Sequence, residues 1–324
     1  MEDCLSRFAR RWLAGHDSGA GMQSFIVAVV NAFFSNFFNA LTLGSLYGLI
    51  AIGYTMVYGI LRLINFAHGD MLMLGAYCVF FGTVTFHLPW GIALIVAIVA
   101  ISLVGIAVDW VAYRPLRNAP RISALISAIA VSFFIESVAV VVFSGLPRPF
   151  YQPDWLIEPF QIGKARLIPL TLIVPLITCV LVAVLLWVVY RTKSGLAMRA
   201  ISRDIETTRL LGVRVDRVIA FTFGIGTALA AASGIMWALR YPQIQPYMGV
   251  FPGMKAFIAA VFGGIGSIHG ALLGGLCLGF IEIMVVAIFP TYSGYRDAFA
   301  FILLVGVLLI RPNGLFGQRV EEKI

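Results

Sequence analysis

Residues 169–190 read PLTLIVPLITCVLVAVLLWVVY, and residues 191–217 continue RTKSGLAMRAISRDIETTRLLGVRVDR. The first stretch is an unbroken apolar run of the length that a helix needs to cross a bilayer, about 20 residues. The second stretch holds seven of the chain's 23 basic residues. Because basic residues gather in the cytoplasmic loops of membrane proteins, we expect a cytoplasmic, helix-forming loop between two spans.

The composition of the whole chain is that of an integral membrane protein. Sixty per cent of its residues are hydrophobic and 12% are charged, against about 25% charged in soluble domains. The apolar runs are continuous, whereas the strands of a membrane β-barrel alternate apolar and polar residues. We therefore expect an all-α, polytopic membrane protein with about eight to ten transmembrane helices, some broken at glycine-rich points. The other apolar runs lie near 25–61, 71–87, 90–113, 122–144, 218–239, 254–289 and 296–311.

The chain has no composition break that would divide it into two globular domains. We expect an N-terminal extension over 1–22, cytoplasmic or interfacial, a transmembrane domain over 23–315 and a cytoplasmic tail over 316–324. Met22 is an alternative start. The 145–168 loop is expected to face outward. The basic residues that mark the cytoplasmic side, besides those of 191–217, are Arg114, Arg117, Arg121, Arg311, Arg319 and Lys323.

Two apolar runs are longer than one span requires. The run 25–61 has room for two spans, although polar residues make its early part amphipathic, so that this part is alternatively an interfacial segment. The run 254–289 contains Gly263, Gly264 and Gly266. Since clustered glycines break membrane helices, we expect two helices there.

Two segments combine glycine with polar residues inside apolar sequence. One reading is a pair of broken helices that line a substrate pathway, because unwound backbone exposes polar groups only where a cavity or protein satisfies them. The plainer readings are close helix packing at the glycines and a capped helix start at the acid; a proton relay is a further alternative. The pathway candidates are Asn65, His68, Gly69, Asp70, Gly263, Gly264, Gly266 and Ser267.

Three acids, Asp109, Glu136 and Glu282, lie in or near apolar runs. A buried acid either pairs structurally or couples an ion to transport, and the sequence leaves both open. The net charge of +8 comes from basic loops, so topology accounts for it without nucleic acid. The scattered cysteines give no metal-ligand spacing, and we expect neither a metal nor a cofactor.

Five motifs in order resemble the LivH-type permease subunit of branched-chain amino acid ABC importers. They are GSLYGLIAIGYTMVYG at 44–59, INFAHGD at 64–70, the loop 191–217, GGIGS at 263–267 and RPNGL at 311–315. The resemblance spans about 37–324. It implies a multi-pass subunit of the bacterial inner membrane that has no catalytic residue of its own, and a cytoplasmic C-terminus.

The resemblance also implies partners and a coupling site. The partners would be a second, LivM-like permease, two cytoplasmic ATP-binding subunits and a periplasmic solute-binding protein, besides membrane lipid; a homodimer of permeases remains an alternative. The loop 191–217 would dock on the ATPases as a short amphipathic helix. The residues that match the family's coupling loop are Gly195, Arg199, Ala200, Glu206 and Gly212; His269 acquires no role.

The alternatives differ in what drives transport. An ion-coupled secondary transporter of amino acids would use buried acids such as Glu136 or Glu282. A channel or a membrane enzyme is disfavoured, because no filter motif or catalytic arrangement is visible. Within the importer reading, the cargo is a branched-chain amino acid (leucine, isoleucine or valine), or urea, an amide or an aromatic acid.

Overall fold

The computed structural model describes residues 19–117, 119–162, 165–311 and 314–316. The expected extension 1–22 and tail 316–324 lie mostly outside this range. Of the extension, 19–22 belong to the first described helix, and of the tail only Phe316 is described.

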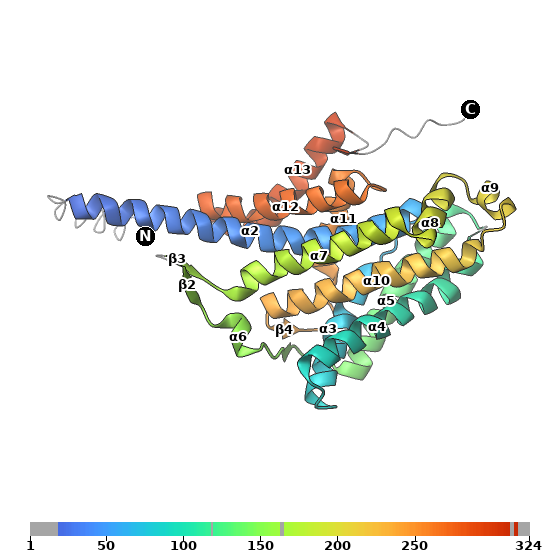
Figure 1. Cartoon of the computed structure of the whole chain (residues 1–324), viewed down its shortest axis with the longest axis horizontal. Coiled ribbons are helices and arrows are strands. Elements are labelled where there is room, and N and C mark those ends of the chain that lie inside the picture. Colours follow the sequence, from blue (N-terminus) through green and yellow to red (C-terminus); the bar gives the residue numbers. More distant parts are fainter. Residues whose placement is uncertain (1–18, 118, 163–164, 312–313, 317–324) are drawn as a thin grey trace.

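The described residues form a bundle of helices (Figure 1), which confirms the expected helical, polytopic class. Six helical segments within them are long and apolar enough to cross a membrane. The eight to ten expected spans also counted three shorter segments, α3, α11 and α13. The helices are α2 (Gly19–Leu61), α3 (His68–Val84), α4 (Trp90–Val108), α5 (Arg121–Phe143), α6 (Asp154–Ile157), α7 (Pro169–Arg191), α8 (Lys193–Arg203), α9 (Ile205–Leu210), α10 (Val215–Arg240), α11 (Val250–Gly263), α12 (Ile268–Ile288) and α13 (Arg296–Ile310), with a π-helical turn η1 (Asp109–Tyr113) and 3-10 turns η2 (Arg114–Leu116) and η3 (Pro290–Tyr295).

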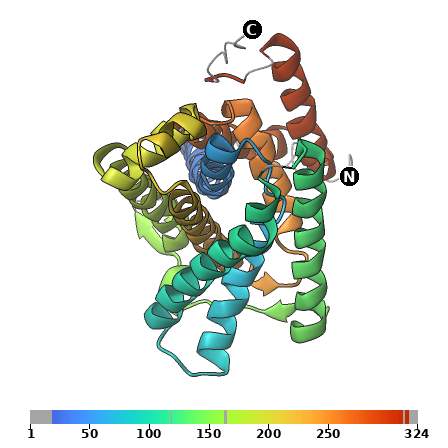
Figure 2. The same cartoon turned by 90° about the vertical axis from the view of Figure 1, so that its right-hand side faces the viewer.

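The long run 25–61 is one continuous helix, so it does not form the two spans for which it has room. Helix α2 has 43 residues and contains no proline that would remove a backbone donor and break it. In its apolar part, Phe33–Leu61, 94% of the most apolar stretch is buried inside the bundle. Seen end-on in Figure 2, α2 runs through the interior of the bundle.

Glycines allow α2 and α12 to pack backbone to backbone. A Cβ added at Gly275 would lie 2.2 Å from the backbone nitrogen of Gly48, and one at Gly279 would lie 2.2 Å from that of Gly44. Small residues permit such approach between membrane helices. The structure thus places these four glycines in direct contact between the two helices.

The run 254–289 breaks where the glycines predicted. Helix α11 ends at Gly263 and α12 begins at Ile268. Between them Gly264 has φ 104° and Gly266 has φ 96°, conformations that glycine adopts without the clash that a Cβ causes.

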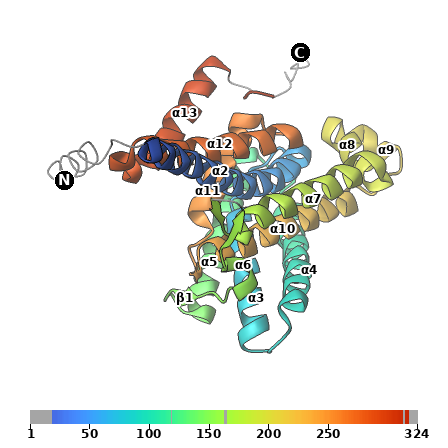
Figure 3. The ribbon, with the colours of Figure 1, turned by 60° about the vertical axis from the view of Figure 1, so that its left-hand side comes forward.

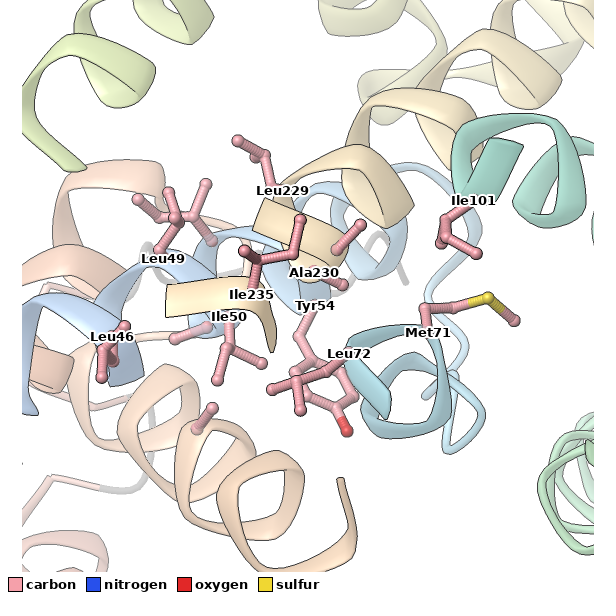
Figure 4. Close-up of a cluster of buried hydrophobic side chains, with 14 of the residues drawn as sticks. Leu46, Leu49, Ile50, Tyr54, Met71, Leu72, Ile101, Leu229, Ala230 and Ile235 are labelled. Carbon is pink, nitrogen blue, oxygen red and sulfur yellow. The ribbon is translucent and has the colours of Figure 1, made fainter. Parts of the chain in front are cut away.

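The central part of the bundle core brings together side chains of α2, α3, α4 and α10. Figure 4 shows Leu46, Ile50 and Tyr54 of α2 packed among Leu72 of α3 and Ile235 of α10, with Ile101 of α4 nearby. These side chains are buried. Because α2 and α10 contribute most of the buried surface, they form the fixed centre around which the loops are placed.

The two ends of the bundle carry different structures. Helices α8 and α9 project at one end, away from α6 and the short strands (Figure 1, Figure 3). The segment 145–168, expected to form an outward cap, contains the strands β1 (Arg148–Pro149), β2 (Phe160–Ile162) and β3 (Ala165–Leu167). Strand β1 pairs antiparallel with β4 (Gln243–Ile244), and β2 pairs antiparallel with β3.

Candidate functional site

The loop 191–217 begins with a fixed junction between α7 and α8. The hydroxyl of Thr192 accepts a hydrogen bond from the Gly195 amide at 3.1 Å and donates one to the Val188 carbonyl at 2.6 Å. The first contact caps α8, whose first amides lack helical partners. The second contact ties this cap to the last turns of α7, so α8 starts at a defined angle to the preceding span.

Gly195 lets the two helices touch through their backbones. A Cβ at this position would lie 2.2 Å from the Val188 carbonyl oxygen and 2.3 Å from that of Val189. Met198 and Ile201, on the same face of α8, are buried, and α8 packs against α2, α7 and α10. Helix α8 therefore packs directly on the central helices.

A second helix, α9, follows α8 without a loop. The carboxylate of Asp204 accepts hydrogen bonds from the amides of Glu206 and Thr207 at 3.0 and 3.1 Å, so it caps a new helix. The expectation of one amphipathic helix across this loop is therefore wrong. Gly212 closes α9 with φ 83° and open space around it, as a glycine after a helix C-terminus does.

The outer face of this two-helix unit combines leucines with basic residues. Leu210 is 87% exposed and Leu211 77% exposed. Arg199 is also exposed, and its guanidinium lies 5.3 Å from the centre of the Tyr190 ring. Among the remaining sequence candidates, Ala200 is half-buried and Glu206 exposed in the first turn of α9. An exposed apolar tip on a rigid, basic support is typical of a docking surface.

Ion pairs fix the base of the loop to the neighbouring turn. Arg117 donates to both carboxylate oxygens of Asp109, at 2.8 and 2.9 Å, and also contacts Asp216 of α10. Arg114 donates to Asp216 at 2.9 Å. The pairing partner of Asp109 is thus Arg117. These contacts place the 114–121 turn and the 191–217 loop at the same end of the bundle.

The first pathway segment lies inside the bundle. Asn65, His68 and Asp70 are all buried, and Tyr113 donates a hydrogen bond to the Asn65 side-chain oxygen at 2.7 Å. The two ring nitrogens of His68 and the Asn65 amide nitrogen have no hydrogen-bond partner within the described part of the chain. Because unpaired buried polar groups are costly, such groups are candidates for contact with a ligand or water.

Two short helices meet at this point. Gly69, in the first turn of α3, packs against Gly249 and Gly253 at the start of α11; a Cβ on Gly249 would lie 2.0 Å from the Gly69 carbonyl oxygen. The Tyr54 ring of α2 covers His68, with ring centres 4.5 Å apart. Helix N-termini carry partial positive charge. The arrangement therefore brings two such ends next to unpaired donors and acceptors.

Two carboxyl groups meet beside this junction. Ser132 of α5 donates to Asp70 at 2.6 Å, and Glu136, one turn further along α5, lies close to the same carboxyl. Two carboxyl groups this close interact electrostatically. This arrangement links α3 to α5, and the Glu136 side chain points toward Asp70.

The second pathway segment, 263–267, is built for packing and capping. The Ser267 hydroxyl accepts a hydrogen bond from the Gly270 amide at 3.2 Å. A Cβ on Gly263 would lie 1.9 Å from the Gly270 carbonyl oxygen. The amides of Leu315 and Phe316 donate to the Phe262 and Gly263 carbonyls. The chain after α13 thus returns to this break and holds it.

The two segments approach each other across α2. Ile64 and Ile265 line one small cavity together with Tyr54 and Thr55, and this cavity has about 10 Å³ of space for a water-sized sphere. Space of that size accommodates about one water molecule. The pathway candidates are therefore neighbours, but the space between them is closed to an amino acid in this conformation.

A buried ionic cluster connects α11, α12 and α13. Lys255 contacts Glu282 at 2.9 Å and Asp297 at 2.7 Å, while Arg296 lies 3.3 Å from Glu282. Tyr47 of α2 donates to the same glutamate at 3.0 Å. Glu282 thus has the basic partners that a structural role requires.

Several of these partners were missed in the sequence. Lys255 is a lone cation in an apolar run and signalled a buried pair, but no spacing rule joined it to Glu282. Tyr190 was not considered, although its ring lies between Arg199 and His269, with ring centres of the two aromatic residues 6.3 Å apart. Ser132 gave no signal at all.

Comparison with known proteins identifies the family. The model for the permease component of branched-chain amino acid transport systems matches residues 36–308. The permease protein LivH of the high-affinity branched-chain amino acid transport system of Escherichia coli is 41% identical over 304 residues, 90% of this chain and 98% of the relative. BraD of Pseudomonas aeruginosa is 39% identical over 300 residues, 88% and 96% of the two chains.

A more distant relative is the permease protein LsrC of the autoinducer 2 import system of Yersinia pestis. It is 32% identical over 155 residues, 46% of this chain and 43% of the relative. The full-length matches agree with the helical bundle and its six candidate spans. The chain therefore belongs to the family of permease components of branched-chain amino acid transport systems, as a multi-pass membrane protein.

Proposed function

We propose that this chain is the membrane-spanning subunit of an ATP-driven importer that carries branched-chain amino acids into the cytoplasm. It performs no reaction itself; ATP hydrolysis takes place in two partner subunits. A periplasmic binding protein would deliver the solute, and a second, LivM-like permease would complete the passage. The family and the names of its full-length relatives support this cargo.

The observation that carries the proposal is the rigid contact of α8 with α7 at Gly195. An ATPase that closes when it binds nucleotide can move the membrane helices only through a rigid contact surface. The exposed Leu210 and Leu211 offer this surface an apolar tip, while the backbone contact at Gly195 passes the force to α7 and α2. This end of the bundle would then face the cytoplasm of the bacterial inner membrane, and the C-terminus with it, because Phe316 is held at the α11–α12 break near the α7 end.

The passage would open at the junction of α3 and α11. The apolar side chain of the cargo needs apolar walls, and its charged groups need brief polar partners. Asn65 and His68 supply unpaired groups, and the adjacent glycines bring the backbones of α3 and α11 into contact. Since the junction is closed here, transport requires the helices to separate.

Purification of the tagged chain from its native membrane tests the proposal. We expect two ATPase subunits and a second permease to co-purify, and mass measurement to identify them. The variant Arg199→Glu, at an exposed position of α8, should keep the permease in the membrane but lose uptake. A homogeneous, transport-competent chain without an ATPase would exclude the importer, and favour ion-coupled transport through Asp70 and Glu136.

A further inference from the structure

A cavity of about 340 Å³ lies at the end of the bundle that the proposed function places in the cytoplasm. Its walls come from four segments: the end of α2 and the turn that follows it, the 116–124 turn into α5, helix α9 and the start of α10. These segments lie at the end facing the viewer in Figure 2. The lining residues are Leu61, Arg62, Leu63, Leu116, Arg117, Ala119, Ala124, Ile205, Arg209, Val215 and Ile219.

Three arginines from three separate segments face this one cavity. Arg117 is neutralised by Asp109 and Asp216. Arg62 and Arg209 have no ion-pair or hydrogen-bond partner for their side chains among the residues that the structure describes. The general bias of basic residues toward the cytoplasm accounts for their side of the membrane, but not for their convergence on one cavity.

The rest of the wall is aliphatic. Leucine, isoleucine, valine and alanine side chains surround the arginines, so the cavity offers both charged and apolar groups to one ligand, as an amphiphile requires. Ala124 belongs to α5, whose neighbouring residues Ile122 and Ile126 are exposed and apolar. These two residues lie two positions from Ala124, on another face of α5, and form an apolar surface outside the cavity on which an acyl chain can lie.

We propose that this cavity binds the phosphate headgroup of an anionic phospholipid from the cytoplasmic leaflet. Arg62 and Arg209 would hold the phosphate oxygens, a geometry for which guanidinium groups are suited. The acyl chains would follow the outward face of α5. Basic pockets between membrane helices on the cytoplasmic side bind such headgroups in general.

A lipid held here acts on the coupling loop. Arg209 belongs to α9 and Arg62 to the turn after α2, so one phosphate would join the projecting helix to the central helix. Arg62 has φ 52°, a left-handed conformation unusual for a residue with a side chain of its size. The bound lipid would keep α9 in place against the ATPase.

Lipid retention by the complete importer tests this site. The complex would be purified in mild detergent, given phosphatidylglycerol or phosphatidylcholine, and weighed intact by native mass spectrometry. We expect phosphatidylglycerol to be retained. The double variant Arg62→Gln/Arg209→Gln should bind it about twenty-fivefold more weakly, at about fivefold for each arginine. Arg311→Gln removes an exposed arginine outside the cavity and should retain the lipid like the unaltered complex.

Subunit stoichiometry in the same spectra shows whether each variant assembles, so loss of lipid from an assembled complex reports on the site alone. Equal retention of both lipids, or retention unaffected by the double variant, would overturn the proposal. Leucine that displaces phosphatidylglycerol in proportion to its concentration would also overturn it, in favour of a product site. None of these results depends on transport, so they leave the proposed function to its own test.

Discussion

Replacement of Gly195 by alanine tests how the loop transmits force. The added Cβ would meet the carbonyl oxygens of Val188 and Val189 at 2.2 and 2.3 Å, whereas real Cβ contacts are not found below 3.0 Å. Both partners are backbone atoms of α7, which cannot turn aside as a side chain can. Helix α8 must therefore retreat from α7 by about 0.8 Å.

Such overpacking costs about 1–3 kcal/mol, too little to unfold a large bundle, and the strain is relieved by displacement of the loop. A misplacement of about 1 Å can lower a rate about a hundredfold when two parts must align. We expect the complex with Gly195→Ala to assemble and hydrolyse ATP at its basal rate. Solute uptake should fall about a hundredfold, and the loaded binding protein should no longer stimulate hydrolysis.

Two glycine variants serve as controls. Gly91→Ala places a Cβ where nothing lies within 4 Å, and it should leave uptake unchanged. Gly212→Asn introduces a residue that tolerates the left-handed backbone at φ 83°, and it should reduce uptake little. Uptake and stimulated hydrolysis at the unaltered rate in an assembled Gly195→Ala complex would refute the idea that force passes through this backbone contact.

Three further predictions concern the interior. A cysteine at Ser267, which is partly exposed, should react with polar thiol reagents in this conformation. A cysteine at the buried Asn65 should react only in the nucleotide-bound or nucleotide-free state in which the passage opens. Protection of both cysteines in every state would mean that the two segments serve only in packing. Lys255→Met should lower the unfolding free energy of the complex by about 3–5 kcal/mol, because Glu282 stays buried with weaker pairing; an unchanged thermal unfolding midpoint would argue against the ionic cluster. Glu136→Gln keeps a side chain that can hydrogen-bond Asp70 and should leave ATP-driven uptake intact. Loss of uptake in this variant would indicate that the carboxyl pair couples an ion to transport.

The sequence predicted the features that depend on local rules. Apolar runs located the helices because span length is set by bilayer thickness. The glycines at 263–266 located a break because a Cβ excludes their backbone conformations. Seven basic residues located the projecting loop. In each case the cause lies within a few consecutive residues.

The sequence did not predict features that depend on residues far apart in the chain. Whether the run 25–61 forms one helix or two depends on its burial among other helices, and apolarity alone leaves that open. The pairing of Lys255 with Glu282 joins two helices whose relative rotation no local pattern contains. The division of the coupling loop into two helices at Asp204 was also not predicted. Aspartate is a common N-cap of a new helix, whereas one longer helix was expected across this position.

The candidate site shows the same limit. His68 and Asp70 were correctly singled out as unusual, and the structure places both in one buried junction. The sequence also contains two His-Gly pairs, at 68–69 and 269–270, and each lies at a helix start, but His68 is buried and His269 is exposed. That α11, rather than α12, meets His68 and Asp70 could not be read from these pairs.

The central claim is that this chain moves its cargo only with ATP hydrolysis in partner subunits. The complete complex would be placed in liposomes with the binding protein outside and ATP inside, and uptake of isotope-labelled leucine followed. We predict uptake that requires ATP and is abolished when the ATPase subunits are left out or inactivated, with ion gradients collapsed by ionophores throughout. Leucine uptake by this chain alone, driven by an imposed ion gradient without ATP, would contradict the account.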